Sequence, residues 1–330
     1  MKNGFSRFEF YLTQLEQMVL KASGETNPAL WLYSNNARTP LFMLEGLSKL
    51  YGGIHNKKKF GKLKEHFKLL EDGIGSIDYY DNLAKDLAND TRVPATVKEY
   101  LQGQAREKIQ RLNDLLQENN WIGENASRIS KIRKKLLEAD WQEPKQEIKS
   151  IRTYYGKEIE EIRKFWSDCG KKFTEMEAQV HEIRRMMRWL SIYPQALQGL
   201  IQLQDSGMRD ADTDKYLTPE IVQSPYNKMP ASGINETVLY FEQQYFLSLS
   251  WMIAKLGSIK DDGLCLMAVA EALQQTESLS HKEAMNRACD IFGGNRQLPA
   301  DILQEASAIC TTFFKEKILE KLIPGNAEEK

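Results

Sequence analysis

Apolar residues recur at helical spacing along almost the whole chain, and this periodicity limits the possible fold more than any other feature. Leu12, Leu15 and Val19, for example, fall on one face of a first predicted helix. Only 10 prolines and 20 glycines are spread over 330 residues, which is too few for a turn-rich β-sandwich. No segment has the pattern of a convincing strand. The sequence therefore predicts an all-α protein.

Breaks in the helical pattern divide the chain into two halves. The segment Asp140–Pro144 is the best candidate boundary and gives a first half of residues 1–140 and a second half of residues 141–330. Within the second half, residues 206–233 are rich in proline, glycine, aspartate and serine, and predict a long loop. The helices that matter below are predicted over residues 27–52 (kinked at Pro40), 59–88, 173–204, 236–256 and 259–274.

A faint internal repeat relates the two halves. The sequence Ile-Gly-Ser-Ile at residues 74–77 recurs as Leu-Gly-Ser-Ile at residues 256–259. In each half it follows a helix with a short motif that ends in an arginine, Arg38 or Arg184. Because the order of these elements is the same in both halves, we predict a duplicated helical bundle.

Composition excludes several classes of protein. Lys and Arg number 45 against 46 Asp and Glu, so the chain is not a globally basic protein that coats nucleic acid. No apolar run approaches the ~18 residues of a membrane helix, and residues 1–7 lack the pattern of a signal peptide. The four cysteines form no CxxC motif. We therefore expect a cytoplasmic protein with reduced thiols and with neither a membrane partner nor a specific nucleic-acid partner.

The most informative segment is a cationic run in the second half. Its members are His181, Arg184, Arg185 and Arg188. Their spacing of i, i+3, i+4 and i+7 places them on one helix face, opposite an apolar stripe that includes Val180 and Ile183. Guanidinium groups present forked donors that match phosphate or carboxylate oxygens, and an adjacent polyanion would raise the proton affinity of the histidine. The alternative is an ordinary solvated face, partly paired with Glu177 and Glu182.

A second basic face lies in the first half, where Lys57, Lys64 and Lys68 fall at i, i+7 and i+11. These lysines flank an apolar stripe rather than oppose it. The alternative interpretation is that their aliphatic stems cover the edge of the core while the ammonium groups stay in water.

The second-half motif, which continues into Trp189, Leu190 and Tyr193, resembles the signature of the CHAD family, the conserved histidine α-helical domain. The Gly75 and Gly257 segments resemble the Leu-Gly turns of that family, each followed by acidic residues. The resemblance covers most of the chain. It implies two four-helix-bundle-like halves related by an internal pseudo-repeat, and a basic groove between them that binds inorganic polyphosphate.

The resemblance also implies which residues would contact a polyanion. They are His181, Arg184, Arg185 and Arg188, with Arg38 and Lys64 from the first half. The chain departs from the family pattern mainly in that first half, where Asn35 stands at the histidine position and Asp78-Tyr79 replaces the usual Arg-Asp pair. In the second half, Ser191 stands where a further basic residue is common. With these departures, the chain resembles a divergent member of the CHAD family that offers fewer positive contacts to a polyanion.

Two other functional classes are alternatives to non-enzymatic polyanion binding. One is a helical scaffold or protein-interaction module with no anion ligand, for which the 206–233 loop would contribute to a partner surface. The other is an enzyme, which is not expected because the chain lacks a P-loop, a GxSxG motif and an HExxH motif. Asp210, Asp212 and Asp214 could hold a divalent cation, but they lack the glycine and distal glutamate of an EF-hand. We expect neither a metal nor another cofactor.

Overall fold

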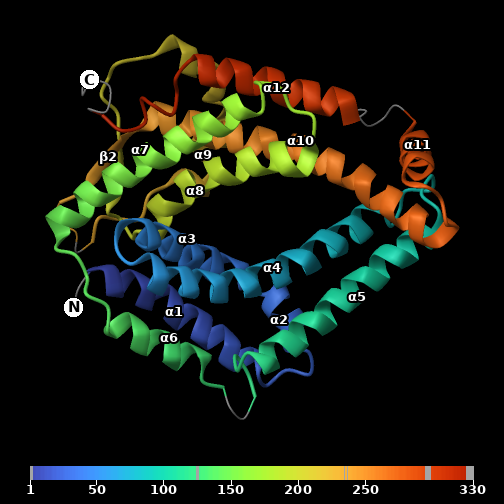
Figure 1. Cartoon of the computed structure of the whole chain (residues 1–330), viewed down its shortest axis with the longest axis horizontal. Coiled ribbons are helices and arrows are strands. Elements are labelled where there is room, and N and C mark those ends of the chain that lie inside the picture. The colour runs from blue at the N-terminus through green and yellow to red at the C-terminus, as the bar shows by residue number, and fades with distance from the viewer. Residues whose placement is uncertain (1–2, 124–125, 234, 236, 294–298, 325–330) are drawn as a thin grey trace. The chain divides into compact units, whose positions relative to one another are not determined.

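Helices dominate the computed structural model of the chain (Figure 1). It describes residues 3–123, 126–233, 235, 237–293 and 299–324. Within these ranges there are only two short strands, so the predicted all-α class is confirmed.

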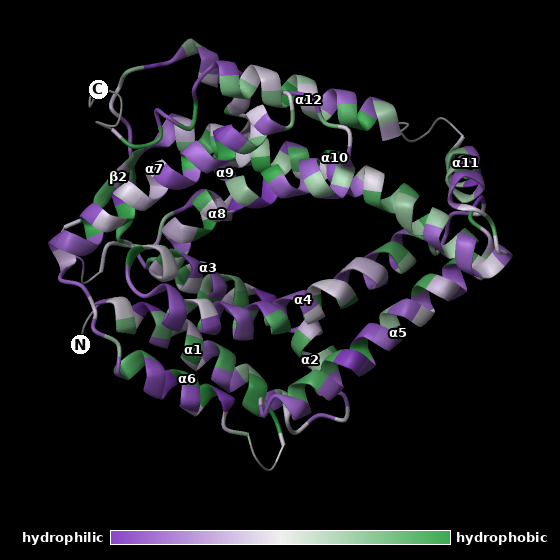
Figure 2. Cartoon of the chain, viewed as in Figure 1, coloured by the Kyte–Doolittle hydropathy of each residue, from purple (hydrophilic) through white to green (hydrophobic). Residues whose placement is uncertain are grey.

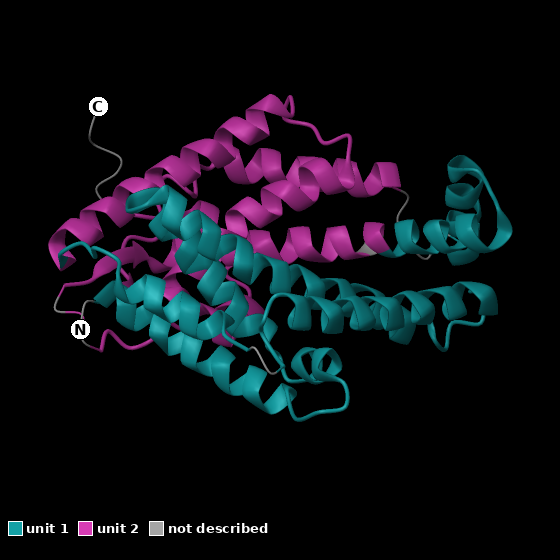
Figure 3. Ribbon diagram, turned by 60° about the horizontal axis from the view of Figure 1, so that its bottom comes forward, with its two compact units in different colours: residues 1–143, 265–293 teal, residues 144–264, 294–330 magenta. Residues whose placement is uncertain are grey.

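Contacts divide the chain into two compact units, which Figure 3 shows in different colours. Unit 1 comprises residues 1–143 and 265–293, and unit 2 comprises residues 144–264 and 294–330. The first change of unit, after residue 143, lies close to the boundary predicted near residue 140. Residues 265–293 nevertheless belong to unit 1, together with the N-terminal part of the chain. The prediction of two contiguous halves does not include this.

Unit 1 is a helical bundle in which α4 packs against α3 and α5, and α1 packs against α6 (Figure 1). Its elements are α1 (Asn3–Ala22), α2 (Pro28–Ser34), α3 (Arg38–Ile54), α4 (Lys57–Leu87), α5 (Ala95–Glu118), α6 (Arg128–Leu137), α11 (His281–Phe292) and the C-terminal part of α10 (Gln243–Glu277). Buried rings of Phe8, Tyr51, Phe60 and Trp141 cluster with centroids 5.2–5.9 Å apart. Such aromatic packing supplies much of the apolar burial in this unit.

The single helix predicted over residues 27–52 is wrong, because the structure has two helices there, α2 and α3. The break falls at Asn35–Ala37, where Asn36 adopts a φ of +58°. Pro40 lies in the first turn of α3, where its missing N–H leaves no helical hydrogen bond unmade. It therefore causes no kink.

Polar side chains attach the C-terminal part of α10 and α11 to unit 1. The hydroxyl groups of Tyr80 and Tyr100 donate to Glu271 Oε1 at 3.2 Å and 2.8 Å. Arg92 Nη1 donates to the carbonyl oxygen of Phe292 at 3.1 Å. These contacts join residues about two hundred positions apart, so no local sequence pattern indicates them.

Unit 2 combines helices with a short sheet. Its elements are α7 (Pro144–Asp168), a π-helix (Met176–His181), α8 (Glu182–Ala196), β1 (Ile201–Gln204), a 3-10 helix (Ala211–Tyr216), α9 (Pro219–Gln223), a second 3-10 helix (Pro225–Asn227), β2 (Leu239–Glu242), the N-terminal part of α10, and α12 (Pro299–Lys315). The two strands pair in parallel, with Ile201 opposite Leu239. The 206–233 loop therefore contains three short helical turns.

The helix predicted over residues 173–204 is shorter than expected, and the expectation of no strand is wrong. Gln198 and Gly199 both adopt positive φ, +50° and +81°, which ends the helical path and starts β1. A four-residue strand offers little alternation to detect, and its partner follows only after the long loop. The sheet is therefore a tertiary feature.

The two helices predicted over residues 236–256 and 259–274 are one helix, α10. Glu236 lies outside the described residues, and α10 begins at Gln243 after β2. Gly257 and Ser258 are helical, as Gly75 is in α4, so neither repeat segment is a turn. The wider pseudo-repeat between the halves stays a prediction.

Hydrophilic and hydrophobic residues alternate along the helices, as Figure 2 shows. Over the described part of the chain, every helix falls short of the length or the apolar character that crossing a membrane would require. The four cysteines are free thiols, of which Cys265 and Cys310 are buried.

Candidate functional site

The cationic run of the second half lies where a π-helix passes into α8. Val180, Ile183 and Met187 are fully buried, so the amphipathic pattern predicted for this segment is confirmed. His181 closes the π-helix, and the three arginines follow on α8. Single π turns inside helices are frequent at functional sites. The basic side chains lie on the half-buried to exposed side.

Arg184 is held against α10. Its Nε donates to the carbonyl oxygen of Ile253 at 3.1 Å. A Cβ placed on Gly257 would lie 3.0 Å from both the Nε and an Nη of Arg184, so the guanidinium group occupies space that only glycine leaves open. The backbone of α10 therefore orients this cation.

Arg185 points to a neighbour on its own helix. Its Nε and an Nη donate to the two carboxylate oxygens of Glu182 at 2.9 Å and 2.8 Å. This is the pairing that an ordinary solvated face would show, and it neutralises much of the charge of Arg185. Among the four predicted contacts, Arg185 thus supports the alternative interpretation most strongly.

His181 lies in a positive environment. Its Nδ1 is 3.1 Å from Glu177 Oε2, yet among the described residues this buried nitrogen has no hydrogen-bond partner. Burial lowers the pKa of His181 below its ordinary value; Glu177 acts in the opposite direction, and the charges of Lys260, Arg184 and Arg185 lower the pKa further. The imidazole is therefore mainly neutral at pH 7 when no anion is bound.

Lys260 of α10 also belongs to this cluster, although it is not among the residues predicted from the sequence. Its side chain is only 15% exposed and pairs with Asp261 at 3.1 Å. The signal that could have found it is its spacing, since it follows Gly257 by three residues and so shares a face of α10 with it. Arg188 is half-buried one turn beyond Arg184 on α8.

Arg38, predicted from the first half, is bound to acids of unit 1. Its Nε donates to Glu71 Oε1 at 2.6 Å, and Nη1 donates to Asp78 Oδ2 at 2.9 Å. The guanidinium group also lies 5.0 Å from the ring centroid of Phe42. A Cβ on Gly75 would lie 2.9 Å from an Nη of Arg38, which repeats the arrangement of Arg184 on Gly257. Arg38 is therefore an internally neutralised cation.

Lys64, the weaker first-half candidate, is half-buried on α4 near an acidic group. Burial raises the pKa of Glu45 to about 7, and the carboxylate of Glu71 adds to this effect, whereas Lys68 and Lys64 oppose it. Lys68 in turn binds Asp72, at 2.6 Å. The lysine face of α4 is therefore engaged with carboxylates of its own unit.

The acidic patch of the 206–233 loop is engaged in loop structure. Asp210 binds Lys321 at 2.6 Å and the hydroxyl of Tyr245 at 3.1 Å. Asp214 binds Arg209 at 2.7 Å. Over the described residues, no group of three or more His, Cys, Asp or Glu side chains is arranged to hold a metal ion.

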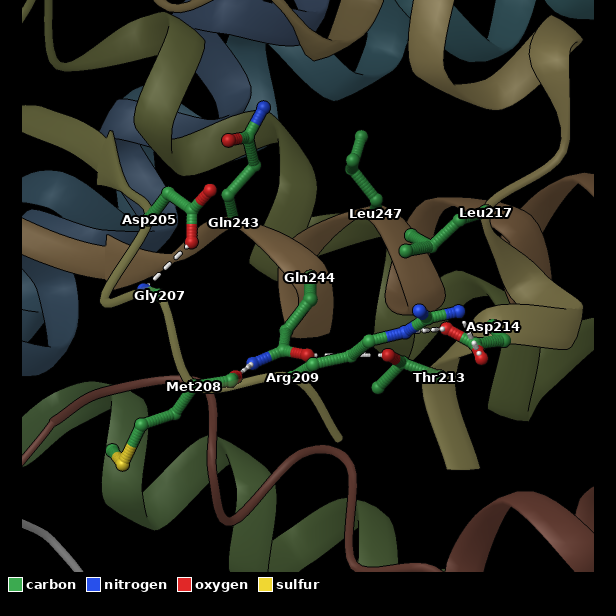
Figure 4. A pocket seen from close by; sticks show the side chains of 10 residues that line it. All are labelled: Asp205, Gly207, Met208, Arg209, Thr213, Asp214, Leu217, Gln243, Gln244 and Leu247. Carbon is green, nitrogen blue, oxygen red and sulfur yellow. Dashed lines mark hydrogen bonds and ion pairs between the residues drawn. The ribbon is translucent and has the colours of Figure 1, made fainter. Parts of the chain in front are cut away.

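A cavity of about 550 Å³ opens beside this patch in unit 2 (Figure 4). Most of its polar lining groups bind one another: Gln244 donates to the carbonyl oxygen of Met208, and the Asp205 side chain accepts from the N–H of Gly207. In Figure 4 Arg209 reaches across to Asp214 in the same way. These bonds hold the 206–233 loop together and attach it to α10, which explains why polar side chains line the cavity.

Comparisons with protein-family models, curated proteins and solved structures show no match to this chain. The geometry of the residues themselves is therefore the basis for assigning a function.

Proposed function

We propose that this protein is a divergent member of the CHAD family that binds inorganic polyphosphate, or a similar polyanion, without catalysing a reaction. The proposed contacts are His181 of the π-helix, Arg184, Arg185 and Arg188 of α8, and Lys260 of α10. In keeping with its free thiols, we also propose that the protein works in the cytoplasm.

The observation that carries this proposal is the positive environment around His181. Burial is the main cause that lowers the pKa of His181, and the charges of Lys260, Arg184 and Arg185 lower it further although Glu177 lies 3.1 Å away. Like charges in one cluster repel one another, and an anion bound among them relieves the repulsion. Arg184 is in addition oriented by the backbone of α10, so less side-chain freedom is lost when it binds a ligand.

The double variant Arg184→Glu, Arg188→Glu should lose polyphosphate binding. Two lost charge-assisted contacts of about 1.5 kcal/mol each correspond to a loss of affinity on the order of 100-fold, before new repulsion is counted. Fluorescence anisotropy with labelled long-chain polyphosphate, measured over a series of salt concentrations, would test this. Wild-type affinity should fall as salt rises, because binding displaces counterions.

The matched control for this experiment is Lys131→Glu, Lys134→Glu, which makes the same change in net charge at two exposed positions of α6. It should change the affinity far less. Equal losses in the two double variants, or a wild-type protein that binds no polyphosphate at low salt, would contradict the proposal.

Binding should also depend on pH through His181. A bound polyanion raises the pKa of this histidine, so the complex takes up a proton, and affinity should increase as the pH falls from 8 to 6. His181→Gln should weaken this dependence while keeping measurable binding at pH 8. Titrations across that pH range test the prediction, and an unchanged slope in the variant would remove His181 from the site.

The alternative, an interaction module without an anion ligand, draws on one observation. Three apolar side chains of the 206–233 loop are strongly exposed: Met208 by 76%, Val222 by 49% and Tyr226 by 82%. Exposed aromatic and methionine side chains are enriched at protein interfaces. Absence of polyphosphate binding in the wild-type protein would favour this alternative.

A further inference from the structure

Two of the four free cysteines belong to unit 2, and they lie on two segments that pack together. Cys169 is the residue directly after α7 and is half-buried, whereas Cys310 lies on α12 and is fully buried. The other two, Cys265 and Cys289, belong to unit 1. The placement of Cys169 relative to Cys310 decides whether these two thiols can react with one another.

Two contacts fix how the end of α7 lies along α12. The rings of Trp166 and Phe314 are stacked, with centroids 5.7 Å apart. Seven residues after Trp166, the backbone N–H of Phe173 donates to the hydroxyl oxygen of Ser307 at 2.9 Å. Ser307 comes seven residues before Phe314, so the two segments run past one another in opposite directions.

Both cysteines lie between these two contacts. Cys169 follows Trp166 by three residues and continues the helical hydrogen bonding of α7, so it shares a face of the last turn with Trp166. Cys310 follows Ser307 by three residues and precedes Phe314 by four, which places it on the same face of α12 as both. In the antiparallel register that the two contacts set, Cys169 stands opposite Cys310.

The electrostatics of the two thiols agree with this placement. Burial raises the pKa of Cys310, and the charge of a deprotonated Cys169 raises it further, an effect that a nearby group exerts. Burial and the charge of Asp168 raise the pKa of Cys169. Both groups are therefore protonated at pH 7, and they react with an oxidant only through a small thiolate fraction.

The chain has room to adjust at Cys169. Gly170 adopts a φ of +64° and Lys171 a φ of +57°, so α7 has ended and Cys169 begins a turn. Nothing lies within 4 Å of the Cβ position of Gly170, so this turn is open. A disulfide requires Cα atoms about 4.4–6.8 Å apart, and a turn can meet that requirement more easily than two rigid helices can.

We propose that Cys169 and Cys310 form a reversible disulfide when the protein meets a peroxide, so that oxidation ties the end of α7 to α12. Cys169 reacts first, because its side chain is the more exposed. Its thiolate attacks one oxygen of hydrogen peroxide, the O–O bond breaks, and a sulfenic acid and hydroxide form. The thiolate of Cys310 then attacks the Cys169 sulfur and displaces a second hydroxide. The two thiols lose two electrons and two protons in total, and one peroxide becomes two water molecules.

This bond acts on the segment that leads into the candidate functional site. Phe173 comes shortly before the π-helix that ends at His181, and α12 contacts this π-helix. The bond also closes a chain loop of about 140 residues, which mainly restricts the unfolded chain. Oxidation should therefore stabilise unit 2. The proposal does not depend on polyphosphate binding.

Peptide mapping of the full chain tests the proposal. The reduced protein is treated with hydrogen peroxide, the remaining thiols are alkylated, and a non-reducing digest is examined by mass spectrometry. We expect the peptide of Cys169 to be joined to that of Cys310, with two hydrogen atoms lost and no oxygen gained. Two of the four thiols should disappear, and dithiothreitol should restore them. The bond should form faster at pH 8.5 than at pH 7, because the thiolate is the reacting form.

Cys169→Ser should abolish the cross-link, whereas Cys289→Ser, the matched change at the other half-buried cysteine, should leave it intact. The wild-type map identifies the partner of Cys169 directly, so the test needs no substitution at the fully buried Cys310. The urea midpoint of the wild-type protein should rise on oxidation, and that of Cys169→Ser should not.

Several outcomes would overturn the proposal. They are a linked peptide from another pair of cysteines, a cross-link between two copies of the chain, and no loss of thiols in a large excess of peroxide. Oxidation of Cys169 to a sulfenic or sulfinic acid while Cys310 stays a thiol would overturn it as well. An unchanged or lower urea midpoint in the cross-linked protein would overturn the stabilising role of the bond.

Discussion

Gly199→Ala is expected to lower the free energy of unfolding by about 3 kcal/mol, because the new methyl group would meet the main chain of the 206–233 loop. Gly199 adopts a φ of +81°, which costs an L side chain about 1 kcal/mol. A Cβ there would also lie 2.0 Å from the carbonyl oxygen of Ala231. The atoms that this methyl group would meet belong to the main chain, so no side-chain rotation relieves the overlap, and such overpacking typically costs about 1–3 kcal/mol more.

The same contact places the loop. Gln202 Nε2 donates to the carbonyl oxygens of Gly199 and Pro230 at 2.9 Å and 2.8 Å, so the two chain segments are joined where the methyl group would intrude. Urea denaturation followed by circular dichroism would measure the loss of stability. Gly207→Ala is the matched control, since Gly207 has a φ of +72° but nothing within 4 Å of its Cβ position. Equal losses for the two variants would show that strain in φ, and not the contact with Ala231, dominates.

Glu45→Gln should make the protein more stable above neutral pH. Glu45 is 3% exposed, and burial raises its pKa to about 7, with a further contribution from Glu71. Between the ordinary glutamate pKa and about 7 the folded protein holds a proton that the unfolded chain has released. Stability contributed by this group is therefore present at low pH and is lost as the pH rises through about 7, by up to about 3 kcal/mol.

The test is the free energy of unfolding of both proteins at pH 5 and pH 8. The two should be close in stability at pH 5, where Glu45 is neutral, and Glu45→Gln should be the more stable at pH 8. Glu65→Gln, an exposed position on α4, serves as the control and should leave the pH dependence as in the wild type. A variant with the wild-type pH dependence would show that Glu45 is ionised without penalty.

Local sequence was sufficient for the helical class and for the face of α8 that carries the arginines. Val180, Ile183 and Met187 are buried because residues three or four apart share a helix face, whatever else the chain does. The glycine repeat was also informative, since Gly75 and Gly257 both lie beneath the arginines with which the repeat had grouped them. Its interpretation as a turn was wrong, because both glycines are inside helices whose surfaces they open.

The longer-range features could not be predicted from the sequence, because they depend on residues far apart in the chain. The strands β1 and β2 are four residues each and meet across the 206–233 loop. Residues 265–293 join unit 1 through contacts such as that of Tyr100 with Glu271. Neither produces a periodic pattern that a short window of sequence can contain.

By itself, the sequence determined that this chain is helical and which faces of its helices are buried, because both follow from apolar spacing over a few turns. It also showed two arginines in corresponding places. Only the tertiary structure decided what each arginine meets: Arg38 meets two carboxylates from 33 and 40 residues further along the chain, and Arg184 meets a backbone oxygen 69 residues away. The partners of these arginines come from residues far along the chain, which a short window of sequence does not contain.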